Sequence, residues 1–349
     1  MATPDYRLQL EGRNLAVGAP VTVDQFVREA LMEKVGPRLL SLSLTEKRDG
    51  EADRLDLELH DADGKLEIPK AGQVLSLQLG WKSGAQVPIG LVDKGRFKVD
   101  EAEWSGPPDR ITIRARSADF AASFDRRQER GHVERTLGVI LSDIAGSQGL
   151  AANVAADLAG LVVPVLDQDE LSDAALLRRL GRMFDAAATV KSGTLIFAPI
   201  GSGRTASGRE LQGIALTRAD GDRASYRRGE RGQFGGVEAR WHDKDTAERK
   251  SVEVGRDSNE GKPPKRLKRV YASEDSAKRA AESAKGKMDR AAAELSLSLA
   301  YARPDLFPEL PVTVSGFKPE IDAQGWLVNE ATHRLDPGGF RTELKLEAR

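Results

Sequence analysis

The sequence of 349 residues predicts a mainly β protein with an α/β insertion. Three observations support this class. Apolar and polar residues alternate strictly in several short runs, turn residues separate those runs, and the spacing becomes helical in the middle of the chain. Apolar residues form 40 % of the chain and 34 glycines add to them, which approaches the ~45–50 % of globular proteins. A mainly disordered chain is therefore excluded, and the length suits two or three domains.

The first third of the chain has the period-two pattern of β-strands. Apolar residues alternate with polar ones over residues 40–44, 55–59, 74–79 and 111–115. This alternation turns one face of each strand toward a core and the other toward water or a partner. Glycine-containing turn signals lie between the runs, so we expect an antiparallel sandwich or barrel.

Helical spacing predicts four helices, over residues 23–34, 136–144, 171–186 and 273–299. Asp24 would cap the first helix, and Ser172 or Asp169 the third. The last helix has an inner face made almost entirely of alanine. Its expected members are Ala277, Ala281, Ala284, Met288, Ala291 and Leu295. Such a face would let the helix lie close to a flat surface.

Strands return around the later helices. The third helix is followed by a predicted β-hairpin over residues 188–198, and further strands are expected over residues 210–217, 224–227, 236–243, 311–315, 325–328 and 342–346. A polar, basic stretch over residues 255–269 is expected to be a loop. We therefore predict a first β-barrel domain over residues 1–132, an α/β insertion over 133–200, and a second β-barrel domain over 201–349 that is interrupted by residues 255–300.

Charge and composition exclude several classes of protein. The chain has 53 Lys and Arg against 54 Asp and Glu, so the net charge of −1 gives no support to a dedicated duplex-binding domain. It has no cysteine, which excludes disulfides, zinc sites with cysteine ligands and thiol catalysis. No basic-then-apolar leader begins the sequence, and no apolar run approaches the ~20 residues of a membrane span. We expect a soluble protein with no membrane insertion.

Two motifs resemble binding loops, and neither meets the requirements of one. Residues 201–206 have a Gly-x-Gly-x-x-Ala pattern, but more glycines and a strand follow where a dinucleotide fingerprint needs a helix. Residues 61–64, Asp-Ala-Asp-Gly, begin like a calcium loop. Lys65 and Gly72 stand where that loop needs oxygen ligands, so a hairpin turn is the better interpretation.

No catalytic, cofactor-binding or metal site is predicted. The four histidines, His60, His132, His242 and His333, are scattered, and no His-Glu-x-x-His or Gly-x-Ser-x-Gly motif occurs. A Ser–His–Asp triad from distant segments is disfavoured for lack of any local signature. His333 is expected to form structural hydrogen bonds rather than to bind a ligand.

Two basic clusters are candidates for contact with a partner. One contains Arg223, Arg227, Arg228 and Arg231; the other contains Lys262, Lys265, Arg266, Lys268 and Arg269. Contact with phosphates or an acidic surface is one interpretation. A solvated loop balanced by nearby acids such as Asp220 and Glu260 is the favoured one. If either cluster meets a partner or a channel, we expect it to be the second.

An ordered series of motifs resembles a known family. The motifs span residues 39–46, 53–64, 68–72, 80–81, 99–115, 168–180, 193–199, 325–333 and 338–346, nearly the whole chain. In this order they resemble phage late-control protein D, which is similar to tail hub proteins of contractile phages and R-type bacteriocins and to the hub part of VgrG-type spikes.

The resemblance implies a structural baseplate hub and no enzymatic activity or cofactor. It implies two tube-like β-barrel domains per chain and a homotrimer that forms a pseudo-hexameric ring, which adapts a six-fold tail tube to a three-fold central spike. The implied partners are the spike protein, the tail tube or tube-initiator protein and other baseplate proteins, with DNA only as cargo in the lumen. The spike is expected to be a separate protein, because no needle segment follows the last strand. The implied location is the tail baseplate of a virion or tailocin made in the bacterial cytoplasm.

Three other functions remain open at this point. The family name suggests a DNA-binding regulator of late genes, although about 27 residues separate the two helices of the insertion where a helix-turn-helix has a tight turn. A cell-wall hydrolase and an adaptor for secreted effectors are the others.

Overall fold

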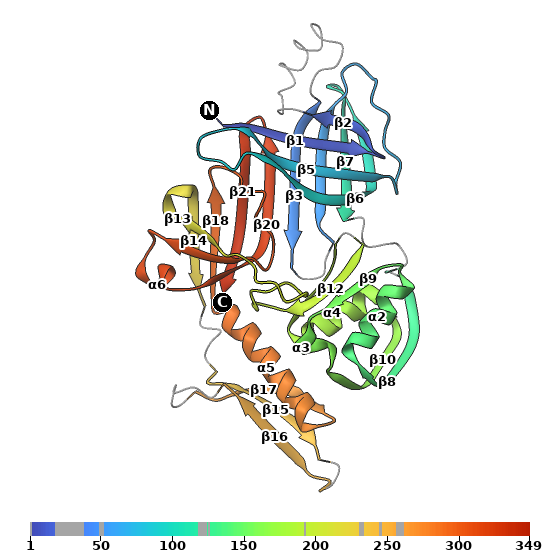
Figure 1. The fold of residues 1–349 in the computed structure, drawn as a ribbon, viewed down its shortest axis with the longest axis vertical. Helices are drawn as coiled ribbons and strands as arrows, with labels where there is room; N and C mark the ends of the chain where they lie inside the picture. The colour runs from blue at the N-terminus through green and yellow to red at the C-terminus, as the bar shows by residue number, and fades with distance from the viewer. Residues whose placement is uncertain are drawn as a thin grey trace.

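A computed structural model describes residues 2–17, 38–48, 52–117, 124, 126–191, 193–229, 234–243, 246–255 and 262–349. The predicted helix over residues 23–34 lies outside them. The described chain is mainly β: one sheet has 13 strands, and three smaller sheets have two or three strands each. Figure 1 shows the large sheet in the upper half of the molecule, an α/β part below it, and a helix with a small sheet at the lower end.

The first seven strands are all antiparallel to their neighbours, in the order β3-β4-β7-β6-β5-β1-β2. Their bounds are β1 Thr3–Leu10, β2 Arg13–Val17, β3 Leu39–Lys47, β4 Arg54–His60, β5 Val74–Ser83, β6 Gly90–Ser105 and β7 Arg110–Ser117. The predicted alternation is confirmed, because the alternating leucines and isoleucines form one buried core. Residues 61–64 form a turn but not a hairpin, since β4 pairs with β3 and β7 and not with β5.

The middle of the chain folds as a separate α/β part. Its elements are β8 Arg127–Thr136, α2 Leu137–Ser147, β9 Ala151–Val154, α3 Ala156–Ala159, β10 Val162–Ser172, α4 Asp173–Phe184, β11 Ala186–Lys191 and β12 Thr194–Pro199. Helix α2 buries its predicted apolar face, the Ser172 hydroxyl caps α4 by accepting from the Ala175 N–H at 3.2 Å, and β11 and β12 form the predicted hairpin. Strands β8, β9 and β10 were not predicted, because their polar residues hide any alternation.

The last part returns to the large sheet. Its strands there are β13 Ile214–Thr217, β14 Gly221–Arg228, β18 Ala293–Leu299, β19 Pro311–Ser315, β20 Trp326–Asp336 and β21 Gly339–Ala348, with the short helices η2 Arg218–Asp220 and α6 Pro319–Asp322. A small sheet and the long helix interrupt this series: β15 Val237–His242, β16 Arg249–Val254, β17 Lys265–Tyr271 and α5 Glu274–Arg290.

Two predictions for this part were wrong. The predicted loop over residues 255–269 contains the start of β17, which pairs in parallel with β15 although most of its residues are charged. The predicted helix over residues 273–299 ends at Arg290, and residues 293–299 form β18. Leu295 fits the helical spacing, but Leu297 and Leu299 continue a period-two pattern that fills the core beneath β18. Ala277, Ala281 and Met288 are buried on α5 as predicted.

The two groups of strands in the large sheet are joined edge to edge. Strand β20 pairs with β3 in antiparallel register, from Glu330 opposite Lys47 to Leu335 opposite Leu42. Residues late in the chain also complete the first core: Ala302, Leu335 and Phe340 pack among the early strands. Among the described residues the main strand order is an open path with β14 at one end and β2 at the other, and β19 and β13 branch from it at β20.

Trp81 on β5 stabilises the junction between the early and the late strands of the large sheet. Its side chain is buried, its indole N–H donates to the carbonyl oxygen of Ala302 at 2.9 Å, and its ring lies 5.9 Å from that of Tyr301 and 5.2 Å from that of Phe340. One side chain of the early strands therefore contacts three residues that follow it by more than 200 positions.

We expect Trp81→Leu to lower the free energy of unfolding by about 2–4 kcal/mol, because it leaves a cavity and an unpaired buried carbonyl. Urea unfolding followed by circular dichroism measures the change. Trp104→Leu is the matched control, since Trp104 is 50 % exposed on β6. Equal losses for the two variants would contradict the role of Trp81.

Candidate functional site

The histidines and the glycine-rich motif considered from the sequence as possible sites lie in separate elements of the structure. No group of three or more histidines and carboxylates among the described residues could hold a metal ion. His60, His132 and His333 are buried on β4, β8 and β20, and the Gly-x-Gly-x-x-Ala segment is a loop that leads toward β13, as predicted. No helix among the residues that the structure describes is long and apolar enough to cross a bilayer.

The predicted contact residues lie on the small sheet at the lower end of the molecule. Lys262 precedes β17, and Lys265, Arg266, Lys268 and Arg269 are all exposed on it. The Arg266 guanidinium is 2.9 Å from a carboxylate oxygen of Glu238 on β15, and that of Arg269 lies 5.6 Å from the ring centre of Tyr271. The structure thus brings this cluster together on one strand instead of a loop.

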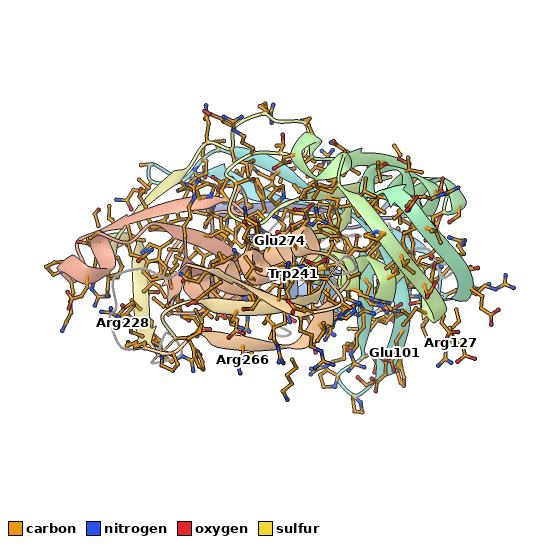
Figure 2. All side chains as sticks on the ribbon, turned by 90° about the horizontal axis from the view of Figure 1, so that it is seen from below. Glu101, Arg127, Arg228, Trp241, Arg266 and Glu274 are labelled. Atoms are coloured by element: carbon orange, nitrogen blue, oxygen red, sulfur yellow. The ribbon has the colours of Figure 1, made fainter. Side chains whose placement is uncertain are left out.

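The other basic cluster lies elsewhere. Arg223, Arg227 and Arg228 are on β14, the end strand of the large sheet, and Arg231 is outside the described residues. Arg227 pairs with Glu294 of the neighbouring strand rather than with the nearby acids expected from the sequence. Figure 2 shows Arg228 and Arg127 at opposite sides of the molecule, with Arg266 between them.

A buried cluster of charged residues sits where the parts of the chain meet. Glu46 on β3 is almost completely buried, and its carboxylate lies 2.5 Å from the Lys94 ammonium and 3.4 Å from that of Lys191. Lys191, at the end of β11, is also 3.5 Å from the Asp53 carboxylate. Lys94 on β6 donates to the Pro304 carbonyl at 3.0 Å. Two carboxylates thus face two ammonium groups from separate parts of the chain.

His333 completes this cluster from β20. Its Nδ1 is 2.8 Å from the Thr342 hydroxyl, and that hydroxyl oxygen accepts from the Arg303 N–H at 3.0 Å. The His333 Nε2 is 3.3 Å from a Glu46 oxygen. A proton on Nε2 is the favourable tautomer, because a bare lone pair there would face a carboxylate. The side chain is completely buried, and its contact with Thr342 confirms the predicted structural hydrogen bonding.

The environment shifts the pKa values of these groups in opposite directions. Burial disfavours ionisation of Glu46, but Lys94, the adjacent His333 and Lys191 together hold its pKa well below the ordinary value. Burial raises the pKa of Asp53 despite Lys191. Burial and then Lys94 lower the pKa of His333, against the effect of Glu46, so the imidazole is neutral at pH 7.

A second network links the same parts nearby. The Arg48 guanidinium is 3.0 Å from a Glu309 oxygen and also pairs with Glu347 on β21. Arg290, the last residue of α5, lies 3.1 Å from Glu347 and also pairs with Asp185, the residue that follows α4. These contacts connect the early strands, the late strands, the insertion and the long helix.

The alternating pattern of the strands contains a signal that could have predicted the buried charged cluster. Glu46 continues the inward parity of Leu42 and Leu44 on β3, and His333 shares the parity of Leu335 on β20. A charged residue in an inward position of an alternating strand must find a buried partner. The partners Lys94 and Lys191 could not be identified, since Lys94 is on the non-adjacent strand β6 and Lys191 is on β11 of another sheet.

Known proteins are similar to this chain in sequence and in fold. Residues 51–338 match the family described as phage tail baseplate hub (GPD). The chain is 40 % identical to the probable baseplate hub protein of Escherichia phage 186, over 97 % of this chain and 94 % of that one, and 39 % identical to that of Escherichia phage P2, over 99 % and 94 %. The chain belongs to the phage tail baseplate hub family.

Solved structures show the same fold at low identity. A 43 kDa tail protein of prophage MuSo2 from Shewanella oneidensis superposes with a TM-score of 0.68 at 15 % identity, over 99 % of this chain and 98 % of that one. An Escherichia coli component of the type VI secretion system gives 0.57 at 13 % identity, over 98 % and 77 %. The predicted family and function are confirmed: this is a baseplate hub protein of contractile phage tails, and it belongs to the virion tail baseplate.

The alternative functions find no support. Helices α2 and α4 of the hub protein are separated by β9, α3 and β10, so they do not form the tight pair of a helix-turn-helix. The hydrolase and the effector adaptor are likewise unsupported by the family match.

We expect Glu46→Gln to lower the free energy of unfolding by roughly 3–5 kcal/mol, because it leaves the buried Lys94 without its carboxylate. Chemical denaturation measures the loss, and adding Lys94→Met to Glu46→Gln should recover part of it. Glu101→Gln is the control, since Glu101 and its partner Arg114 are both more than half exposed. If the single and double variants were equally unstable, the pairing would not be the cause.

Stability should also fall as the pH is lowered below about 6.5, the unfolded pKa of histidine. Burial lowers the pKa of His60, His132 and His333 in the folded state, with Arg38 or Arg135 contributing for the first two. The unfolded chain therefore binds protons that the folded chain does not. Between pH 6.5 and 5.5, the slope of the unfolding free energy against pH should be smaller in His333→Asn than in the wild type, by up to about 1.4 kcal/mol per pH unit. An unchanged slope would contradict a neutral His333.

Proposed function

We propose that three copies of this hub protein form a closed ring that presents six similar β surfaces to the tail tube. The observation that supports this is the pair of separate apolar cores within one sheet. One core lies under β1–β7 and the other under β13, β14 and β18–β21, and β3 and β20 join them. Two related modules per chain let a threefold assembly match a sixfold one.

The proposed domain boundaries follow from the separate apolar cores. We propose that residues 1–132 and 201–349 form the two barrel-like domains, that 133–200 form the insertion, and that 255–300 interrupt the second domain. Distinct apolar clusters in the insertion and beneath α5 support separate units. Phe124 packs with the insertion and Phe340 with the first core, so single residues cross these boundaries.

The ends of the large sheet suit contacts between copies. Strands β14 and β2 each pair on one side only among the described residues. Unpaired edges favour addition of another strand, and a head-to-tail contact between unlike edges closes a ring when its rotation is right. Charged residues on the outer faces of β4 and β7, such as Asp56 and Arg114, would face a channel or a neighbour.

The partners follow from the ring. We propose that the hub protein contacts a separate central spike protein, the tail tube or its initiator, and other baseplate proteins, with DNA only as passing cargo. The exposed cations Lys262, Lys265, Arg266, Lys268 and Arg269 are proposed to meet one of these proteins. The role is structural and without catalysis, and the protein is made in the host cytoplasm before assembly.

Light scattering after size-exclusion chromatography tests the ring. We expect a species of three times the subunit mass of 37.9 kDa, and cryo-electron microscopy of tails should place it on the central axis. The double variant Arg223→Glu/Arg228→Glu on β14 should shift the protein toward monomer, while the same changes at Arg178 and Lys278 should not. A monomer at all concentrations, together with an off-axis position in tails, would overturn the proposal.

A further inference from the structure

A groove separates the insertion from the small sheet and its helix. Its volume is about 740 Å³, and it is walled by β10 and α4 on one side and by β17 and α5 on the other. Clefts that bind ligands fall in a range of about 300–1,000 Å³. Figure 1 shows these elements together in the lower half of the molecule, below the large sheet.

The rim of this groove is basic. Its cations are Arg179, Arg182, Arg269, Arg279 and Lys287, against the two acids Asp167 and Asp169. No carboxylate of the described chain lies within 4 Å of the guanidinium groups of Arg182, Arg269 or Arg279. Arg179 and Lys287 donate to backbone carbonyls, of Asp167 and Arg182, which hold them at the rim. The groove therefore has an excess of positive charge with unneutralised members on both walls.

The groove is also lined by apolar side chains. Val162 and Val165 on β10 are 48 % and 63 % exposed, and Met183, Phe184 and Leu267 line the groove from the other elements. A polyphosphate would gain little from such a surface, and Asp167 and Asp169 would repel it. A ligand that combines acidic and apolar groups satisfies both parts of the lining.

Both walls include a strand with an unpaired edge. Within the described residues, β10 pairs only with β8, and β17 pairs only with β15. An extended segment can therefore hydrogen-bond to backbone groups in addition to its side-chain contacts, as in other cases of strand addition. An extended segment also places alternate side chains on opposite faces, which suits an apolar lining beneath a charged rim.

We propose that this groove binds an extended segment of a partner protein in which acidic residues alternate with apolar ones. The acidic side chains pair with Arg182 and Arg279 on facing helices and with Arg269 on β17. The apolar side chains cover the valines of β10. This site lies within one subunit, so it does not depend on the proposed ring.

Fluorescence anisotropy with a labelled ten-residue peptide of alternating Glu and Val tests this inference on the full chain. We expect saturable binding that weakens at least tenfold in Arg182→Glu/Arg279→Glu and at least tenfold when Gln replaces Glu in the peptide. Arg178→Glu/Lys278→Glu is the matched control. Both its residues are exposed on the same two helices without lining the groove, and it should bind like the wild type.

Three outcomes would overturn the inference. The first is that the wild type shows no saturable binding of the Glu peptide, and the second is that the Gln peptide binds as tightly as the Glu peptide. The third is that the Arg182→Glu/Arg279→Glu variant binds the Glu peptide as tightly as the wild type does. A 20-base-pair DNA duplex that displaces the peptide and itself requires Arg182 and Arg279 would assign the groove to nucleic acid instead. If the charge-reversed variant fails to fold by circular dichroism, Arg182→Gln/Arg279→Gln replaces it with the same criteria. Failure of the ring would appear in light scattering and leave the peptide result unaffected.

Discussion

The antiparallel pairing of β3 with β20 is the constraint on which the rest of the hub protein depends. It joins segments almost 290 residues apart, and the Thr45 and Thr332 hydroxyls meet across it at 3.3 Å. Its inner side carries Glu46 and His333, whose burial is tolerable only while Lys94 and Thr342 face them. A slip of one residue would turn these groups to the wrong face and leave a buried ammonium unpaired, so the polar cluster specifies the register as well as stabilising it.

The same constraint explains how the other parts are attached. Apolar clusters hold each part together internally, whereas charged side chains provide many of the contacts between parts. Lys191 connects the insertion to Glu46 and Asp53, and Arg290 connects α5 to the insertion and to β21. Because ion pairs are directional and costly when broken, they help to fix the positions of the insertion and α5 relative to the large sheet.

The sequence was informative where pattern and burial coincide. Leu40 to Leu44 and Ile111 to Ala115 alternate because one face of each strand meets a core. Helix α2 was predicted because four of its five buried residues are apolar residues at helical spacing. It was uninformative where tertiary contacts override local preference. Strand β17 is mostly charged and forms because β15 lies beside it. The boundary between α5 and β18 was predicted wrongly because Leu295 fits both the helical spacing and the period-two pattern of a strand. Only the core beneath the sheet decides between the two.

The groove differs from the buried charged cluster in how its charges are used. Its two walls are already tied together, since the Ser283 hydroxyl on α5 donates to the Arg182 carbonyl on α4 at 3.0 Å and Lys287 donates to the same carbonyl. The width of the groove is thus set before any partner arrives, and a segment that enters it incurs little cost for ordering the site. The buried cations Lys94 and Arg48, in contrast, are paired with carboxylates. Arg182 and Arg279 have no carboxylate partner among the described residues and line the two walls of the groove, so they are available to the proposed segment, unlike Arg178 and Lys278, which lie outside the groove.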